Sequence, residues 1–410
     1  MYAFKPHVFT KHSLYSITKP EGKIKALICG DGKNLYFNGE SASDSEFHNI
    51  WEYNLAGQQW RLLISIRCLS KSPFTYDSII GTILESNYLV ICPIESQDTR
   101  PFNDELSSLT SQLHVCNLNS KSSLVRRTSG RIPNPSFPHN FIRHGKYLYT
   151  VGVSRDGGLF SDVYKLNMEN DVCEIVYTCR GLDANEPVGR WYHTLVYGNN
   201  MIYIFGGYDL RPGKGPFSFP KISAFDLQNC CWKKIDTHGD GDENHTPRYP
   251  TGREGFSVTS YTDPDSGETN VIISGGADFK YEYKIDDEGR ERFHRALLIG
   301  FSDVWRLNLT SLKWSYLQRF GIVLPRHVSD HSTTISPTGK LFIFDEHISD
   351  NDKEQKTCNS ALYSTWVRIP KLTDICWEAV LHYFPNLKSM TDKEIISLGI
   401  PLQSFKSRIN

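Results

Sequence analysis

Met201-Ile-Tyr-Ile-Phe-Gly-Gly207 is the stretch that decides the fold of this chain. Its alternation of β-branched and aromatic residues is typical of a strand that packs on both faces. The diglycine that follows allows backbone conformations closed to residues with a Cβ atom, and it lets a neighbouring strand approach closely. A further strand, a turn and Trp232 come next in the segment 222–232. Together these features predict one small antiparallel sheet.

The same unit recurs along the chain. A second clear copy is Val271-Ile-Ile-Ser-Gly-Gly276, followed by a strand at 303–309 and then Trp314. Four weaker copies have the same order of elements, at 34–39 with 50–55 and Trp60, at 88–92 with 113–118, at 146–152 with 162–167, and at 341–344 with Leu362, Tyr363 and Trp366. The last three lack the diglycine. Six copies of one composite pattern indicate a repeat architecture.

The order of strand, diglycine, strand, turn and tryptophan resembles the kelch repeat. In that family each repeat is a four-stranded antiparallel sheet, and the sheets pack radially as propeller blades. The five intervals from Trp60 to Trp366 average about 61 residues, close to the ~50 of a kelch unit once loop insertions are added. The predicted fold class is therefore all-β, a six-bladed kelch β-propeller with a short C-terminal α-helical appendage. The segment 2–18 is a candidate outer strand for one blade.

Composition limits the classes of partner. The chain has 45 basic and 46 acidic residues, so it lacks the positive field that non-specific nucleic-acid or anionic-membrane binding uses. No stretch approaches the ~20 apolar residues of a membrane span, and the N-terminus has no signal-peptide pattern. We expect no nucleic-acid or membrane partner, and a cytoplasmic or nuclear location. The ten cysteines show no zinc-ligand spacing and are interpreted as buried free thiols, so no metal or cofactor is predicted.

After residue 370 the pattern changes from strands to helices. Apolar residues recur at helical spacing over 372–383, which predicts an amphipathic helix ended by Pro385. Thr391-Asp-Lys-Glu394 is a capping box that opens a second helix, and apolar positions at 402, 405 and 409 indicate a third. The predicted domains are a propeller at 1–370 and a helical tail at 371–410. A segment of this size is too small to hold a core of its own, so we expect it to need a partner surface.

The first tail helix contains Leu372-xxx-Cys376-xxx-Val380, which resembles the BC box of SOCS-box-type proteins. That resemblance implies binding to the elongin B/C adaptor, with the leucine in an apolar pocket of elongin C and the small cysteine allowing close helix packing. The implied adaptor-binding residues are Leu372, Ile375, Cys376 and Val380. Lys371 departs from the small residue that is usual there.

Ile400-Pro401 resembles the start of the box that selects a cullin scaffold. Phe405 and Ile409 are displaced by one position from the usual spacing, which leaves the choice of cullin open. A kelch propeller followed by a BC-like box resembles the substrate receptors of cullin-RING ubiquitin ligases. This implies a non-catalytic receptor that binds degrons of substrate proteins, some of them C-terminal tails. The alternative is a kelch scaffold, cytoskeletal or signalling, whose tail helix only packs on the propeller.

Residue patterns for catalysis are missing from the sequence. It has no grouped histidines at metal-ligand spacing, no GxSxG and no phosphate-binding loop. We therefore predict no catalytic residues. His193 and His331 are interpreted as residues that hold their own loops.

Three arginines precede the first strands of consecutive repeats, at Arg190, Arg253 and Arg326. A guanidinium donates paired hydrogen bonds that match the two oxygens of a carboxylate. We therefore predict a substrate pocket in which these arginines bind a terminal carboxylate, with Tyr192 and Tyr208 packing on the residues before it. The alternative is that such an arginine pairs with blade backbone or with an acidic neighbour. The insertions at 94–111, 208–221 and 277–300 are candidate recognition loops.

Overall fold

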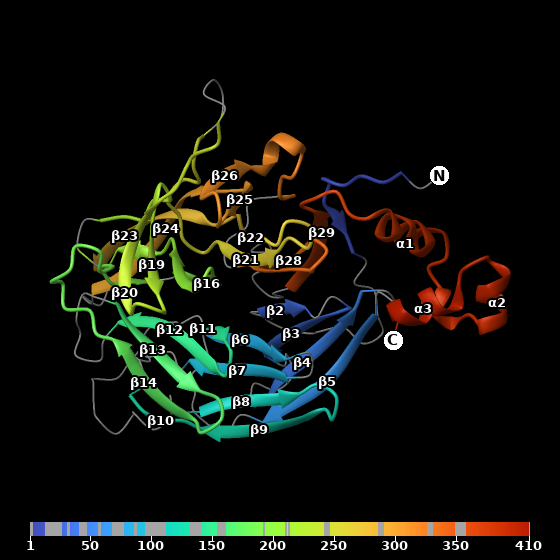
Figure 1. Cartoon of the computed structure of the whole chain (residues 1–410), viewed down its shortest axis with the longest axis horizontal. Coiled ribbons are helices and arrows are strands. Elements are labelled where there is room, and N and C mark those ends of the chain that lie inside the picture. Colours follow the sequence, from blue (N-terminus) through green and yellow to red (C-terminus); the bar gives the residue numbers. More distant parts are fainter. Residues whose placement is uncertain are drawn as a thin grey trace. The chain divides into compact units, whose positions relative to one another are not determined.

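The computed structural model describes residues 3–12, 27–30, 33–40, 47–55, 59–67, 78–85, 88–94, 112–131, 141–153, 161–191, 193–209, 211, 214–241, 247–285, 291–325, 331–348 and 358–409. The chain forms two compact units. The first comprises Met1–Lys71 and Ser332–Asn410, and the second comprises Ser72–His331. Strands dominate both, and the helices of the tail form one cluster after the last strand (Figure 1).

Eight sheets lie among the described residues, and the six larger ones are the blades that the sequence predicts, each built on four antiparallel strands. Blade 1 is β2 (Leu27–Gly30), β3 (Asn34–Glu40), β4 (Phe47–Asn54) and β5 (Gln59–Arg67), and blade 2 is β6 (Ser78–Glu85), β7 (Tyr88–Ile94), β8 (Gln112–Asn117) and β9 (Ser122–Arg127). Blade 3 is β11 (Phe141–His144), β12 (Tyr147–Val153), β13 (Ser161–Asn167) and β14 (Val172–Tyr177), extended by β10 (Ser129–Gly130), which is parallel to β14.

Blade 4 is β16 (Thr194–Gly198), β17 (Met201–Phe205), β19 (Lys221–Asp226) and β20 (Cys231–Asp236). Blade 5 is β21 (Ser257–Thr262), β22 (Thr269–Ser274), β25 (Val304–Asn308) and β26 (Lys313–Tyr316). Blade 6 contains β27 (Ser332–Ile335), β28 (Lys340–Ile348) and β29 (Cys358–Trp366). The fold class is a six-bladed β-propeller.

The first unit contains blades 1 and 6. Their innermost strands, β2 and β27, lie side by side. Phe37 of blade 1 packs edge-on against Phe344 of blade 6, with the ring centroids 5.0 Å apart. Trp60 lies 4.5 Å from the ring of Phe37 and closes the same cluster. Burying aromatic side chains of this size accounts for much of what holds two sheets face to face, since truncating one to alanine typically costs about 3–5 kcal/mol.

The N-terminal segment completes blade 6. β1 (Thr10–Lys11) pairs antiparallel with β29, placing Thr10 opposite Ser364. The strand expected somewhere in 2–18 therefore belongs to this blade. Trp366 must be reinterpreted as a result, because it ends the third strand of its blade, whereas Trp60, Trp232 and Trp314 lie on fourth strands. The pattern placed it wrongly because the fourth strand comes from the other end of the chain.

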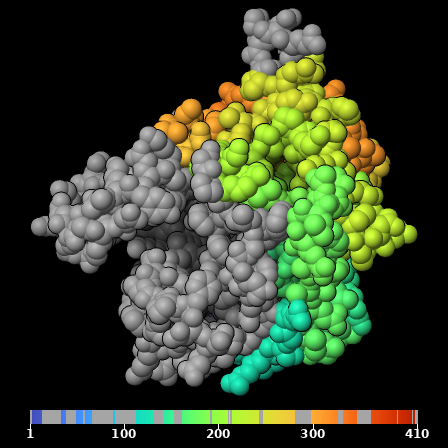
Figure 2. Space-filling model, turned by 90° about the vertical axis from the view of Figure 1, so that its left-hand side faces the viewer, coloured from blue at the N-terminus to red at the C-terminus, as the bar shows by residue number. Residues whose placement is uncertain are grey.

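The second unit contains blades 2 to 5. The innermost strands β6, β11, β16 and β21 contact one another in that order. Figure 2 shows the green surface of blade 3 next to the yellow-green surface of blade 4. Trp314 is fully buried and its indole Nε1 donates to the Thr237 hydroxyl at 3.0 Å. The tryptophan of this repeat thus packs in the apolar interior between blades while its one polar atom stays satisfied.

The diglycine of blade 4 is explained by close approach. Gly206 has a φ of +56°, and a Cβ at this position would lie 2.4 Å from the ring of Phe256 in blade 5. No side chain fits in that space. Gly276 of blade 5 has a φ of +92° and is equally crowded by Phe256. These glycines are therefore required both by conformation and by the packing of adjacent blades.

The tail forms the three helices that the sequence predicts, α1 (Leu372–Tyr383), α2 (Asp392–Ser397) and α3 (Leu402–Ile409). Thr391 and Glu394 make the predicted capping box at the start of α2. The expectation that the tail cannot hold a core is wrong, because Leu387, Ile395 and Phe405 are buried against one another. The two turns between these helices add to the same cluster, because Leu387 of the first turn is buried in it and Ile400 of the second packs against it.

Cysteine burial follows the prediction only in part. Cys116, Cys173 and Cys179 are buried free thiols. Cys230 and Cys376 are exposed and Cys231 is half-buried, so the interpretation as buried thiols is wrong for these three. Cys230 lies in the turn between β19 and β20 with a φ of +49°, which explains why it leaves the blade interior.

Candidate functional site

The arginine of blade 5, Arg253, is fully buried and its donors are all directed at the blade. Its Nη1 donates to the Gly275 carbonyl at 3.0 Å and to Asp303, and its Nη2 donates to the other Asp303 oxygen at 2.9 Å. The Nε donates to the Thr251 carbonyl at 2.9 Å, and the guanidinium lies 3.9 Å from the ring centroid of Phe301. This is a paired ion bridge inside one blade.

The arginine of blade 4, Arg190, begins from the same framework. It precedes the first strand, donates its Nη1 to the Gly206 carbonyl at 3.2 Å, and lies 3.6 Å from the ring centroid of Phe217. Among the described residues, however, nothing accepts a hydrogen bond from its Nε. Burial lowers the pKa of Arg190 to about 9, which the charge of Asp209 partly opposes. Arg190 is therefore a buried cation with incomplete compensation.

One sequence position accounts for the different hydrogen bonding of Arg253 and Arg190. Ile273 pairs with Trp305 in blade 5, and Ile204 pairs with Ser223 in blade 4. The residue two places before each partner is Asp303 in blade 5 and Lys221 in blade 4. Blade 4 thus carries a lysine where blade 5 supplies the carboxylate for its arginine.

Tyr208 lies beside Arg190. The short strand β15 (Arg190–Trp191) pairs antiparallel with β18 (Tyr208–Asp209), which places Trp191 opposite Tyr208 and Arg190 opposite Asp209. The Tyr208 hydroxyl donates to the Lys214 carbonyl at 2.6 Å. Burial raises the pKa of Tyr208, and the charges of Glu254 and Asp278 add to the effect. The structure therefore brings two of the five predicted pocket residues together on one ribbon.

Asp209 belongs to the same ribbon but is already paired. Its carboxylate accepts from the Nη2 of Arg211 at 2.6 Å and from the Nε at 3.0 Å. Burial acts to raise the pKa of Asp209, yet the Arg211 hydrogen bonds outweigh it and hold the pKa below its ordinary value. Arg211 therefore competes with Arg190 for this carboxylate.

The loop that carries Arg253 touches the segment after β18 that packs on Arg190. A Cβ on Gly252 would lie 3.0 Å from the Pro216 carbonyl oxygen and 3.2 Å from that of Phe217. Phe217 is the residue that packs on Arg190, and Gly252 directly precedes Arg253. Tyr192 and Arg326 lie outside the described residues. Their roles, and the binding of a carboxylate by Arg190 and Arg253, stay predictions.

The described part of the insertion at 277–300 is a ribbon of two paired strands, β23 (Ala277–Ile285) and β24 (Glu291–Gly300). Its base carries three consecutive exposed apolar residues, Leu297, Leu298 and Ile299. The two histidines hold blades as expected, since His193 Nε2 contacts the Val151 carbonyl at 3.1 Å and His331 Nε2 contacts the Ser274 hydroxyl at 3.0 Å. His193 joins its own loop to the second strand of the preceding blade, since its Nδ1 also contacts the Arg190 carbonyl.

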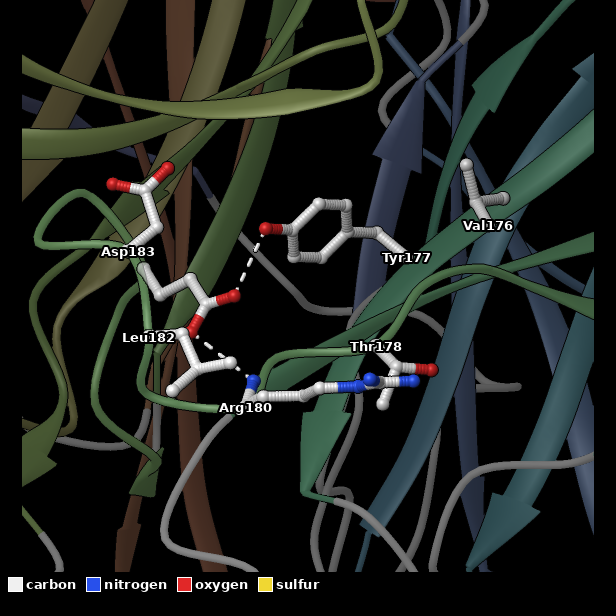
Figure 3. Close-up of a pocket in the computed structure, with 7 residues that line it drawn as sticks. Val176, Tyr177, Thr178, Arg180, Leu182 and Asp183 are labelled. Carbon is white, nitrogen blue, oxygen red and sulfur yellow. Dashed lines mark hydrogen bonds between the residues drawn. The ribbon is translucent and has the colours of Figure 1, made fainter.

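A pocket of about 560 Å³ lies at the connection from blade 3 to blade 4, which the sequence did not single out. Glu186 is one of its lining residues and accepts from the Tyr177 hydroxyl at 2.9 Å and from the Arg180 amide at 3.1 Å, bonds drawn as dashed lines from the labelled Tyr177 and Arg180 in Figure 3. Burial raises the pKa of Tyr177 to about 12. Both oxygens of Glu186 accept hydrogen bonds within this loop, so we interpret its carboxylate as structural. Glu186 directly precedes Pro187 in the loop that leads to Arg190, and this position is the only sequence signal that could have pointed to it.

The predicted adaptor-binding residues of α1 divide between two faces. Leu372 is 73% exposed and Cys376 is exposed, while Ile375 is half-buried. Tyr383, two turns further along the same face, is 52% exposed. Val380 instead packs against the tail cluster, as does Ile400, whereas Pro401 is exposed. An apolar stripe that includes Leu372, Cys376 and Tyr383 is thus left open along α1. We call it the α1 stripe.

Comparison with known proteins decides the family. A model described as the KLHDC2/KLHL20/DRC7 Kelch-repeats domain matches residues 142–369. The chain belongs to this kelch-repeat family. It is therefore a kelch propeller, a protein-interaction module.

Two relatives and one solved structure illustrate the likeness. The Kelch domain-containing protein 10 homolog of Drosophila melanogaster is 26% identical over 432 residues, which cover 100% of this chain and 66% of the relative. Kelch domain-containing protein 10 of Homo sapiens is 21% identical over 393 residues, covering 93% and 78%. A solved chain titled "Structure of YjhT" is similar in fold alone, with a TM-score of 0.50, 12% identity, and coverage of 84% of this chain and 94% of the other.

Two further findings concern the described residues. Within the ranges given above, no group of three or more histidine, cysteine, aspartate and glutamate side chains could hold a metal ion. None of the helices in those ranges has the length and apolar character that crossing a membrane requires.

Proposed function

We propose that this kelch propeller is the substrate-recognition subunit of a cullin-RING ubiquitin ligase that uses the elongin B/C adaptor. The observation that carries the proposal is the α1 stripe. Leu372 and Tyr383 stay exposed although the tail has a buried core of its own. An apolar face left open beside a formed core is typical of a docking surface.

The composition of the stripe supports a helix-binding adaptor. Fully burying a leucine side chain contributes roughly 1.5–3 kcal/mol, and Leu372 is the most exposed apolar residue of α1. Cys376, one turn later, is small and exposed, which lets a partner helix approach closely. The stripe thus has the large and small positions that the resemblance to a BC box implies for elongin C. Ile400 and Pro401 are proposed to contact the cullin.

For the substrate side, we propose that Arg190 and Tyr208 bind a peptide degron, with the terminal carboxylate as the group that Arg190 recognises. The support is the buried guanidinium that lacks the carboxylate found in blade 5. Arg253 enters as the residue that fixes the adjoining loop, since its donors already have acceptors. A peptide library presented with free and with amidated C-termini tests this, because only the free form offers the charge.

The adaptor proposal is tested with the Leu372→Ala/Cys376→Phe double variant of the full chain. Binding to recombinant elongin B/C should be lost, while the thermal unfolding temperature changes by no more than a few degrees, because neither side chain is buried. Leu182→Ala is the matched control, since Leu182 is also an exposed leucine (85%) but lies in the connection from blade 3 to blade 4. Full retention of binding by the double variant would sink the proposal. A large fall in thermal stability would favour the alternative, a kelch scaffold whose tail only completes its fold.

A further inference from the structure

One carboxylate joins α1 to the strands of blade 6. Glu378 Oε1 accepts from the indole Nε1 of Trp366 at 3.0 Å and from the ammonium of Lys340. Lys340 is the first residue of β28 and Trp366 is the last residue of β29, and the two are paired in register. The ammonium also lies 5.4 Å from the Trp366 ring centroid. We call these three residues the Glu378 junction.

Low exposure and backbone hydrogen bonds hold the Glu378 junction in place. The side chains of Lys340 and Glu378 are each only 22% exposed, so the ion pair is partly shielded from water and from salt. The Trp366 backbone is fixed separately, because its N–H donates to the Pro6 carbonyl at 3.0 Å and its carbonyl contacts His7 Nδ1 at 3.0 Å. The segment that completes blade 6 and the tail helix therefore both attach to Trp366.

The buried apolar cluster of the tail lies apart from this junction. All described members of the buried tail cluster lie between Trp377 and Phe405, within the tail itself. The chain enters α1 through Lys371, which has an extended conformation (φ −64°, ψ 149°) and makes no side-chain capping bond. A linker of this kind does not by itself fix the angle of the helix that follows it.

Glu378 also lies away from the α1 stripe. At 100° per residue, position 378 is about 120° around the helix from position 372 and farther from 376. A change at Glu378 therefore leaves the exposed Leu372 and Cys376 untouched.

We infer that Glu378 is a positioning residue that fixes the orientation of the docking helix α1 relative to blade 6. The inference rests on the proposed function for its consequence, since a ligase receptor must hold its adaptor at a defined angle to the substrate. Orientation of two reacting partners contributes to rate without adding contacts at the reacting atoms. Loss of the junction should leave the adaptor bound to α1 but without a fixed orientation relative to blade 6.

The test uses the full chain with Glu378→Ala, and with Glu378→Gln as the rescue, because the amide oxygen of a glutamine can still accept from Trp366 Nε1 and from the Lys340 ammonium. Spin labels are introduced as non-canonical residues at the exposed positions Gln59 and Lys393, because the exposed Cys230 and Cys376 would take up thiol labels. The wild-type and Glu378→Gln chains should each give one narrow distance distribution. Glu378→Ala should give a broad one. An unchanged narrow distribution in Glu378→Ala overturns the inference.

Two further readouts separate positioning from folding. Affinity for recombinant elongin B/C should stay within about twofold in every variant, because the altered site is separate from the stripe. Ubiquitin transfer to lysines of the chain itself, in the reconstituted ligase, should slow about fivefold in Glu378→Ala and stay close to the wild-type rate in Glu378→Gln. A broad distribution with unchanged transfer overturns the positioning role. Failure of the wild-type chain to bind elongin B/C overturns the proposed function, whereas the label distances still decide whether Glu378 fixes α1.

Discussion

Blades 4 and 5 place an arginine at the same point, above the same backbone carbonyl and against a phenylalanine ring, yet the two arginines differ in charge compensation. Arg253 is bridged by both oxygens of Asp303. Arg190 has Lys221 at the corresponding place and shares Asp209 with Arg211. The same motif thus has two outcomes. In blade 5 it locks the blade, and in blade 4 it leaves a buried cation with incomplete compensation, to which we propose that a ligand carboxylate binds.

The comparison predicts its largest effect for Arg253→Ala. Removing one partner of a buried ion pair leaves the other charge uncompensated, so the free energy of unfolding should fall by about 3–5 kcal/mol. Chemical denaturation followed by tryptophan fluorescence measures this. Arg319→Ala is the control, because Arg319 pairs with Asp240 nearer the surface and should cost about 1 kcal/mol or less. Equal losses for the two variants would contradict a special role for the blade 5 bridge.

Arg190→Met should destabilise far less than Arg253→Ala. The variant loses the bond to the Gly206 carbonyl but also removes a charge whose burial is only partly compensated, so we expect a change of about 1 kcal/mol or less. The same denaturation experiment decides it. A loss as large as that of Arg253→Ala would mean that Arg190 has a structural partner equal to Asp303, and the distinction between the blades would fall.

Lys221→Asp sharpens the comparison by giving blade 4 the residue of blade 5. A carboxylate at this position should pair with Arg190 and stabilise the chain by about 1 kcal/mol, the net contribution of a typical intramolecular hydrogen bond. It should also weaken any peptide that binds through a free C-terminus. Lys221→Asn is the control, since it loses the exposed Lys221–Asp236 pair without offering a carboxylate. Equal stability of the two variants would contradict the predicted pairing.

The smallest effect concerns the turns after the third strands. Asp226 of blade 4 occupies the position of Asn308 in blade 5, and both accept from two backbone amides of the turn. Hydrogen bonds from Lys233 and Asn229 lower the pKa of Asp226. Its contribution is therefore present above the ordinary carboxylate pKa of about 4 and is lost as the pH falls through the lowered value.

An Asp226→Asn variant should keep the turn and lose this pH dependence. Thermal unfolding of wild type and variant from pH 6 down to pH 2.5 measures the difference. The wild type should be the more stable chain at pH 6, and its advantage should shrink as the pH falls. An advantage that stays constant with pH would show that the carboxylate charge does not matter in this turn.

Much of the fold follows from local signals. Alternating apolar residues and the diglycine identify blades 4 and 5. These residue types are required by local packing, as where a Cβ on Gly206 would clash with the ring of Phe256. The tail helices follow from apolar spacing and from the Thr391 capping box. The placement of Trp366 does not follow, since the fourth strand of its blade, β1, is more than 340 residues away in the sequence.

The roles of the candidate site residues are harder to predict from the sequence. Arg190 and Arg253 look alike in their own loops, and what separates them is a residue at the start of the third strand, Lys221 in blade 4 and Asp303, just before the strand, in blade 5. That difference is visible in the sequence only once the two third strands are aligned. The role of Glu378 cannot be read from the helix pattern either, because its partners Lys340 and Trp366 belong to blade 6.

Whether this kelch propeller is a ligase receptor is tested most directly by co-purification with recombinant elongin B/C. The full-length chain and a chain ending at Pro370 are compared under the same conditions. Stable binding by the full-length chain and none by the shorter chain is the expected result. Absence of binding by both, or equal binding by both, would contradict a docking role for the tail.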